Sequence, residues 1–265
     1  MIPKKIHYIW LGNKPKTDLV LRCITSWKMF LPDYEIIEWN DDDLKSIGNN
    51  YVSEAVSAQK WAFASDYLRL YILYHHGGVY LDTDVQITNS ITPFLCHDFF
   101  IGYEHYKKGF CPMTAVIGSK QYNYIIKELL DEYNDLHFIT SDNTYDLTPN
   151  TVRFGHYFNK KLNIPFPAPT DNLTLLDKNS FIYPFHYFCN HIDNKKNYTI
   201  HHYNGSWIDG YARRDKFSFL NFRITRFKKI SDKNNVMPLW HNEKILLKIK
   251  LTSKKTYALT TTIKD

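Results

Sequence analysis

Apolar residues recur at two different spacings along the first forty residues, one typical of strands and one typical of helices. Residues 4–10 place apolar side chains mainly at every second position, and a polar segment with Gly12 and Pro15 follows them. This pattern predicts a short β-strand. Residues 18–30 predict a helix, and residues 34–39 predict a second strand. Strand, helix and strand in this order favour an α/β sheet with parallel neighbours.

A longer apolar segment follows and contains two isolated charges. Residues 58–76 hold no glycine or proline and are apolar on nearly every side of a helical projection, which indicates a buried helix. Apart from Lys60 near its start, the fully charged residues of this helix are Asp66 and Arg69. We expect Gly77 and Gly78 to end the helix, and the next residues to form a strand.

The rest of the chain gives weaker patterns. Residues 140–180 are rich in Asn, Asp, Thr and Pro and predict long loops with short elements between them. The other elements that we expect are a helix over 121–133 and strands near 99–103, 113–117, 181–187 and 199–203.

Composition indicates a folded protein without a bilayer-spanning helix. The chain has 265 residues, of which 44% are hydrophobic, and no apolar run is long enough to cross a membrane. The N-terminus has no signal-like apolar region, so we expect a cytoplasmic protein. Its four cysteines lack metal-site or disulfide spacing and are expected to be reduced thiols.

Charge is distributed unevenly along the chain. Residues 212–265 carry 14 Lys+Arg and 4 Asp+Glu, a net of +10, whereas residues 1–211 carry 19 and 23, a net of −4. We therefore expect a catalytic body over 1–211 and a basic C-terminal segment over 212–265. Apolar residues recur at helical spacing within 212–230, which predicts a basic amphipathic helix. Such a segment suits an anionic membrane surface or nucleic acid, unless the helix packs on the body.

Two carboxylates follow the predicted strand over residues 79–81. Asp82 and Asp84 would point to the same side if the chain stays extended. A pair of carboxylates about 4 Å apart repels by roughly 4 kcal/mol at an effective dielectric of ~20, and a divalent cation removes this cost. Oxygen ligands favour Mg²⁺ or Mn²⁺ with nucleotide phosphates. The alternative is a solvated acidic turn.

Asp66 and Arg69 are the second candidate group. On an exposed helix they would form an ordinary ion pair three residues apart. On a helix that is apolar all round, their desolvation costs several kcal/mol per ion, which favours a functional role such as holding sugar hydroxyls.

The third candidate group follows the last predicted strand. His202 could supply a nitrogen ligand to Mn²⁺, and Gly205 would let the backbone approach a phosphate. Trp10, at the end of the first strand, could stack on a nucleobase. Either side chain could instead be structural.

Three motifs stand out along the N-terminal part of the chain: I-H-Y-I-W-L-G at 6–12, A-F-A-S-D-Y-L-R at 62–69 and L-Y-H-H-G-G-V-Y-L-D-T-D-V at 73–85. Together they resemble glycosyltransferase family 32, which is distantly similar to the glucosyltransferase domains of large clostridial toxins. The resemblance implies a GT-A fold, Rossmann-like and nucleotide-sugar-binding, with a mixed central sheet; the basic helical tail would be added to it.

The resemblance also implies roles for residues near the donor sugar. Trp10 would stack on the base, Asp66 and Arg69 would hold the sugar, Asp82 would contact ribose and sugar, and Asp84 would bind the metal. Asp82 is counted with Asp84 among the expected metal ligands, and Asp66, Arg69 and Asp82 among the expected catalytic residues.

Further expected residues lie in the C-terminal motif. His202 would be another metal ligand, and Ser206 and Trp207 would reach the diphosphate, with Trp207 also acting in catalysis. Relatives carry a Thr-Gly-Pro stretch on the acceptor side. The nearest candidate here, residues 147–150, lacks the glycine.

The activity that the resemblance implies is retaining transfer of a hexose from a UDP-sugar with Mn²⁺ or Mg²⁺, and we expect displacement on one face of the sugar. Galactose, glucose and N-acetyl hexosamine are all open as the hexose. The acceptor would be a glycan or lipid-linked oligosaccharide in bacterial capsule, O-antigen or lipooligosaccharide synthesis, with peripheral contact to the inner face of an anionic membrane. The alternatives are a nucleotide-sugar phosphohydrolase and a toxin-like transferase that modifies protein. Nucleic-acid binding would leave the acidic body unexplained.

Overall fold

The chain folds into two compact units, Met1–His202 and Tyr203–Asp265. A computed structural model describes residues 1–44, 46–106, 109–192, 194–204, 211–219, 222–229, 243–252 and 255–262. The two units meet between His202 and Tyr203, whereas the charge distribution predicted a boundary after residue 211.

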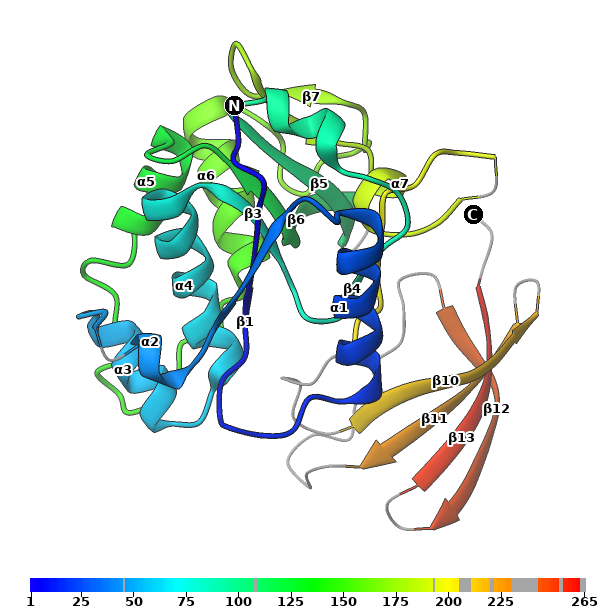
Figure 1. Cartoon of the computed structure of the whole chain (residues 1–265). Coiled ribbons are helices and arrows are strands. Elements are labelled where there is room, and N and C mark those ends of the chain that lie inside the picture. The colour runs from blue at the N-terminus through cyan, green and yellow to red at the C-terminus, as the bar shows by residue number, and fades with distance from the viewer. Residues whose placement is uncertain are drawn as a thin grey trace. The chain divides into compact units, whose positions relative to one another are not determined.

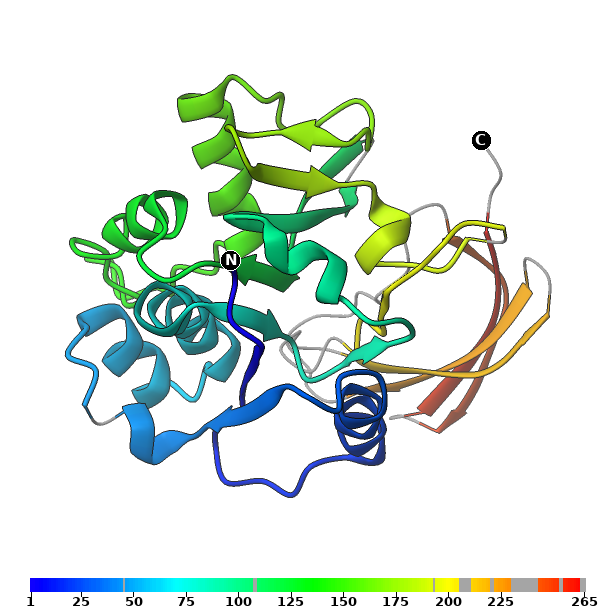
Figure 2. The ribbon, with the colours of Figure 1, turned by 45° about the horizontal axis from the view of Figure 1, so that its top comes forward.

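A seven-stranded mixed sheet forms the centre of the first unit. Its strand order is β2-β1-β3-β6-β5-β8-β7, and Figure 2 shows it crossing from β2 to β7. β1 pairs in parallel with β2 and β3, and β6 pairs antiparallel with β3 and β5. The strands are β1 (Lys5–Ile9), β2 (Glu35–Trp39), β3 (Gly78–Leu81), β5 (Phe99–Tyr106), β6 (Gly109–Ser119), β7 (Thr174–Leu175) and β8 (Ser180–Tyr183). A separate antiparallel pair joins β4 (Val85–Ile87) to β9 (Thr199–His201).

Helices cover both faces of this sheet. Helix α1 and helix α4 lie on opposite faces of the sheet (Figure 1). Two neighbouring residues of β1 show this: Tyr8 packs edge-on against Trp27 of α1, whereas His7 contacts His76 at the end of α4. The main helices are α1 (Asp18–Phe30), α3 (Asn50–Ser57), α4 (Trp61–His76), α5 (Tyr124–Asp131) and α6 (Asn150–Leu162). The short ones are α2 (Asp41–Leu44), α7 (Phe185–Phe188) and the 3₁₀ helix η1 (Thr92–Cys96).

The N-terminal predictions from sequence are confirmed. The first strand, the helix over 18–30 and the second strand appear as β1, α1 and β2, with β1 and β2 parallel. The buried helix appears as α4, in which Asp66 is 9% and Arg69 5% exposed. Of the four cysteines, Cys23, Cys111 and Cys189 are buried and Cys96 is exposed.

The prediction of loops over 140–180 is wrong where α6 forms. Phe154, Tyr157 and Phe158 are buried on one side of this helix, at the spacing that packs a helix on a sheet. The glycine and asparagines around them lower the helix propensity of the segment, so tertiary packing decides its structure.

His7 fixes the turn between α4 and β3. Its Nδ1 accepts a hydrogen bond from Trp39 Nε1 (3.2 Å), so its Nε2 carries the proton and donates to the Gly77 carbonyl (2.9 Å). Gly77 and Gly78 have φ angles of 60° and 107°, which side chains rarely adopt. A Cβ on Gly78 would lie 2.9 Å from the Lys5 carbonyl oxygen. The turn therefore requires glycine and a neutral histidine.

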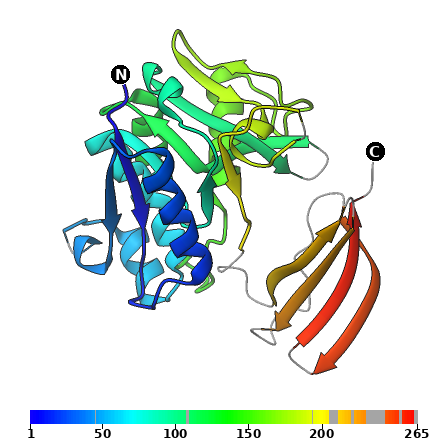
Figure 3. The same cartoon turned by 45° about the vertical axis from the view of Figure 1, so that its right-hand side comes forward.

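The second unit is an antiparallel sheet, so the predicted amphipathic helix over 212–230 is wrong. Its strand order is β10-β11-β13-β12 (Figure 3). The strands are β10 (Tyr211–Phe219), β11 (Phe222–Lys229), β12 (Glu243–Thr252) and β13 (Lys255–Thr262). The aromatic and β-branched residues of this segment favour strands once β13 supplies a partner for β11. Helical spacing of four apolar residues was not sufficient to exclude this alternative.

Within the described ranges, none of the helices has the length and apolar character needed to cross a bilayer.

The buried His7 predicts a loss of stability in mild acid. Burial lowers its pKa from 6.5 to about 4, so the unfolded chain binds a proton that the folded chain does not. Stability is unaffected by His7 above pH 6.5, falls as the pH drops from 6.5 to 4 and then levels off. The loss should total about 3 kcal/mol. Urea unfolding of wild type and His7→Gln across this range measures it. His191→Gln, at an exposed histidine, is the control, and equal pH slopes in wild type and His7→Gln would contradict the assignment.

Candidate donor-sugar and metal site

A tight turn carries Asp82 and Asp84 out of the central sheet. β3 ends at Leu81, and the Asp82 amide continues the pairing by donating to the Ala115 carbonyl of β6 (2.9 Å). The Val85 amide then donates to the Asp82 carbonyl (3.0 Å), which closes a turn before β4. The segment is therefore a turn and not the extended chain assumed from sequence, but it still brings the two carboxylates together.

Helix α1 holds the far side of this turn. Trp27 Nε1 donates to the Val85 carbonyl (2.7 Å), and Ser26 Oγ accepts from the Ile87 amide (3.0 Å). Both contacts are buried. The position of Asp84 thus depends on α1, on the opposite face of the sheet from α4, as well as on β3.

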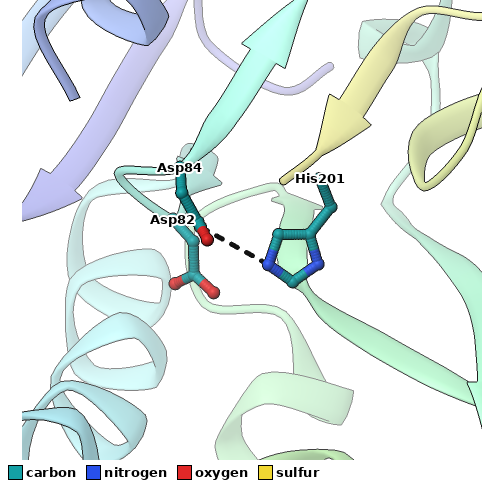
Figure 4. Close-up of side chains that lie close together, drawn as sticks. All are labelled: Asp82, Asp84 and His201. Atoms are coloured by element: carbon teal, nitrogen blue, oxygen red, sulfur yellow. Dashed lines mark ion pairs between the residues drawn. The ribbon is translucent and has the colours of Figure 1, made fainter. Parts of the chain in front are cut away.

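His201 completes a group of three possible metal ligands. It lies opposite Val85 in the β4–β9 pair, and its Nε2 is 3.4 Å from Asp84 Oδ1 (Figure 4). One ligand atom each from Asp82, Asp84 and His201 lies within 4.8 Å of the others. Two carboxylates and an imidazole form a donor set that suits Mn²⁺, and Mg²⁺ less well because of the nitrogen.

The structure gives His202 a different position from the one expected. Its Nε2 is 3.0 Å from Gln86 Oε1, and its amide donates to the Asp84 carbonyl (3.0 Å). Of the two histidines, His201 lies with Asp82 and Asp84 in the group of possible metal ligands, whereas the side chain of His202 contacts Gln86.

The carboxylates around His201 favour its protonated form. Burial alone would lower the pKa of His201, but the neighbouring Asp84 carboxylate outweighs burial and raises the pKa to about 9. The Asp84–His201 pair therefore holds a proton at neutral pH. A metal ion would compete with that proton for the same nitrogen, so metal binding at this site would release a proton.

Arg69 links helix α4 to the metal-ligand group. Its Nη2 is 2.9 Å from Asp66 Oδ1, and its Nη1 is 3.4 Å from Asp82 Oδ1 and donates to the Thr114 carbonyl (2.8 Å). The guanidinium also lies 4.7 Å from the centre of the Tyr80 ring. Removing one partner from a buried group of a guanidinium and two carboxylates lowers the stability of the fold by roughly 3–5 kcal/mol, because a buried charge is left unpaired.

The protonation of this group follows from burial and charge. Burial raises the pKa of Asp66 to about 6 despite the opposing effect of Arg69. Burial alone would lower the pKa of Arg69, but Asp82, Tyr80 and Asp66 raise it, so the guanidinium stays charged. Tyr80, whose hydroxyl donates to Asp82 Oδ1 (2.7 Å), has a pKa well above its usual value because it is buried.

Asn150 is a residue of the site whose role the sequence did not indicate. Its amide donates to Asp66 Oδ2 (3.1 Å) and its Nδ2 donates to the Asp66 carbonyl (3.0 Å). Its Oδ1 is buried and makes no hydrogen bond. The segment 147–150 was expected on the acceptor side. A polar residue at the first position of a helix is the signal that could have indicated Asn150, had α6 been predicted.

The other expected residues lie at the edge of this region or outside the described chain. Trp10 is partly exposed after β1, with its Nε1 donating to the Lys14 carbonyl (2.7 Å) and Lys16 Nζ 5.7 Å from its ring centre. Ser206 and Trp207 fall outside the described residues.

Relatives are similar to this chain over different lengths. The uncharacterized glycosyltransferase L373 of Acanthamoeba polyphaga mimivirus is 26% identical over 210 residues, covering 74% of this chain and 76% of that protein. Inositol phosphoceramide mannosyltransferase 3 of Schizosaccharomyces pombe is 30% identical over 101 residues, but the match covers 36% of this chain and 27% of that protein.

A solved structure supports the fold. The PaToxG glycosyltransferase superposes with a TM-score of 0.51 at 20% identity, covering 62% of this chain and 72% of that one. At this identity the likeness shows the fold alone, which is GT-A-like with a mixed central sheet.

The family match spans the region that builds the site. Residues 17–101 match the model described as the glycosyltransferase sugar-binding region containing DXD motif. They include Asp66, Arg69 and the Asp82-Thr83-Asp84 motif. Residues 17–101 of this chain are therefore similar to the DXD-containing sugar-binding region of glycosyltransferases, and the match includes the residues that build the site.

Proposed function

We propose that this protein is a glycosyltransferase that moves a hexose from a UDP-sugar to a glycan or lipid-linked acceptor, with a divalent cation and with retention of anomeric configuration. The observation that supports this proposal is the joining of two groups by one side chain. Arg69 contacts both Asp66 and Asp82, so a metal-ligand group and a polar pair suited to sugar hydroxyls are adjacent.

Asp82, Asp84 and His201 would hold the cation. When bound, a Mn²⁺ ion supplies positive charge that stabilises the departing diphosphate. Asp66 and Arg69 would then bind sugar hydroxyls from α4, with the Asn150 Oδ1 as a further acceptor for a hydroxyl. Trp10 would stack on the base, and Ser206 and Trp207 would contact the diphosphate and the leaving group.

Displacement would occur on one face of the donor sugar. The acceptor oxygen bonds to the anomeric carbon as the bond from that carbon to the phosphate oxygen breaks. The electron pair of the broken bond stays on the phosphate, and a phosphate oxygen takes the proton of the acceptor hydroxyl. Asp66 is held by Arg69 and the Asn150 amide, which suits it to hydroxyl binding rather than to covalent attack on the sugar.

The biological setting that we propose is bacterial surface polysaccharide synthesis, with the enzyme in the cytoplasm at the inner membrane face. Support for membrane contact comes from the second unit. Its Ile224, Leu246, Leu247 and Ile249 are 42–55% exposed, and the exposed Lys248 lies among them on β12. Apolar side chains beside cations suit an anionic bilayer, at about 1 kcal/mol per Lys or Arg near the surface.

Membrane contact predicts binding to anionic vesicles that depends on these side chains. Full-length protein should sediment with vesicles of phosphatidylglycerol and phosphatidylcholine, and less with phosphatidylcholine alone. Replacing Leu246, Leu247 and Ile249 by Ser should release most of it, whereas replacing the exposed Leu173 and Leu175 of the first unit should not. The proposal would be contradicted if the triple variant sedimented with the vesicles as much as wild type and the double variant do.

The transferase activity predicts metal-dependent consumption of a nucleotide sugar. UDP-glucose, UDP-galactose, UDP-N-acetylglucosamine and, in view of the yeast relative's name, GDP-mannose form the donor panel. Asp84→Ala should lose at least about 100-fold in metal-dependent turnover with its unfolding transition unchanged. Proton couplings at the anomeric carbon of the product report retention. Donor consumption that no acceptor accelerates would indicate a hydrolase, and a fully active Asp84→Ala would refute the site.

The two adjacent histidines provide a matched test of the metal ligands. His201→Gln should weaken Mn²⁺ binding by about 10–100-fold, and His202→Gln should leave it within about threefold. Isothermal titration with Mn²⁺ and UDP measures both. Because the residues are neighbours, a nonspecific effect of the substitution should appear in both variants. A stronger loss in His202→Gln would contradict the assignment of His201.

A further inference from the structure

A fourth carboxylate lies beside the candidate site on a different strand. Glu104, near the end of β5, is partly exposed, and its Oε1 accepts a hydrogen bond from Thr151 Oγ1 (3.2 Å). Thr151 directly follows Asn150, whose amide binds Asp66. The helix that supplies a contact to Asp66 therefore also supplies one to Glu104.

Short contacts connect Glu104 to the metal-ligand group as well. Thr151 Oγ1 is 3.4 Å from Thr114 Oγ1, and the Thr114 carbonyl accepts from Arg69 (2.8 Å). Glu104 is thus positioned next to the start of α6, beside the residues that contact Asp66 and Arg69.

An aromatic pair continues from Glu104 along the same side of β5. Tyr106 lies two residues further, so its side chain is on the same side of the strand. Its ring stacks with Phe166 at 5.4 Å and 22°, and His156 of α6 packs edge-on to Phe166. All three side chains are at least partly exposed.

Gly155 allows this pair to form. A Cβ at this position would lie 2.2 Å from Phe166 Cδ2, so only a glycine lets the ring rest on α6. A glycine inside a helix costs about 1 kcal/mol relative to alanine. The helix carries this cost at the position where Phe166 meets it.

We propose that Glu104, Tyr106 and Phe166 form the acceptor subsite, and that it binds a sugar ring. This inference rests on the proposed transferase function. A carboxylate accepts strong hydrogen bonds from sugar hydroxyls. The face of the Tyr106 ring that is turned away from Phe166 can pack against the apolar C–H face of a pyranose, and Phe166 supports this ring from the other side. The acceptor is therefore a glycan at this position. Glu104 orients its hydroxyl, while the proton passes to the leaving phosphate.

Binding and activity can be tested separately. Methyl glycosides of glucose, galactose, mannose and N-acetylglucosamine serve as probes, with UDP and Mn²⁺ present. Saturation-transfer NMR with irradiation of aromatic protons should give signals on the ring protons of at least one glycoside in wild type. Tyr106→Ala should lose these signals, and Tyr106→Phe should keep them. Tyr145→Ala is the control, because Tyr145 is an exposed tyrosine stacked on Phe138 elsewhere in the first unit.

Kinetics give the second readout. Glu104→Gln keeps an oxygen for Thr151 but removes the charge, so acceptor KM should rise about tenfold or more, and the ratio of transfer to acceptor-independent donor hydrolysis should fall. Gly155→Ala, which displaces Phe166, should also raise acceptor KM, with thermal unfolding as the check on folding. An equal fall of hydrolysis and transfer in Glu104→Gln would overturn the proposal.

The two proposals fail in different ways. If no glycoside gives a signal in wild type, or the signals survive in Tyr106→Ala, the acceptor subsite is wrong even when donor hydrolysis is metal-dependent. If wild type consumes no nucleotide sugar but binds glycosides through Tyr106, the proposed transferase function is wrong and the sugar subsite stands.

Discussion

The buried guanidinium of Arg69 is the interaction on which the site depends. It lies on a helix that is otherwise apolar, and it contacts a carboxylate of that helix, a carboxylate of the DXD turn and a carbonyl of β6. Each of these groups would be costly to bury alone. Because Arg69 contacts all three groups, it sets the position of α4 relative to β3 and β6, and it thereby brings Asp66 next to Asp82. The same cost explains why charge occurs at this point of an apolar helix.

Two further anchors keep the DXD turn in place from either end. Before it, the neutral His7 and the two glycines set where β3 begins. After it, Trp27 and Ser26 of α1 bond the backbone of β4. β4 in turn pairs with β9 and thereby carries His201 to Asp84. Residues separated by more than a hundred positions thus meet through a short antiparallel pair, whose register selects one histidine of two.

The start of α6 joins the donor and acceptor sides of the molecule. Asn150 binds Asp66 and Thr151 binds Glu104, so consecutive residues face the two groups. The second unit has a different composition and a different architecture, an antiparallel sheet with exposed apolar residues on β12. The group of possible metal ligands and the Asp66–Arg69 pair all lie in the first unit.

The sequence by itself determined the local features. Alternation predicted β1 and β2, the apolar run predicted α4, and the isolated charges identified Asp66 and Arg69 because burying an unused charge is costly. Local signals did not predict α6, because its Gly155 lowers helix propensity and is needed only for the contact with Phe166. They did not predict β10 and β11 either, because the apolar residues there have helical spacing and the strand structure depends on the pairing of β11 with β13. Only the tertiary structure chose His201 over His202, since both have the same chemistry and strand pairing decides which one faces Asp84.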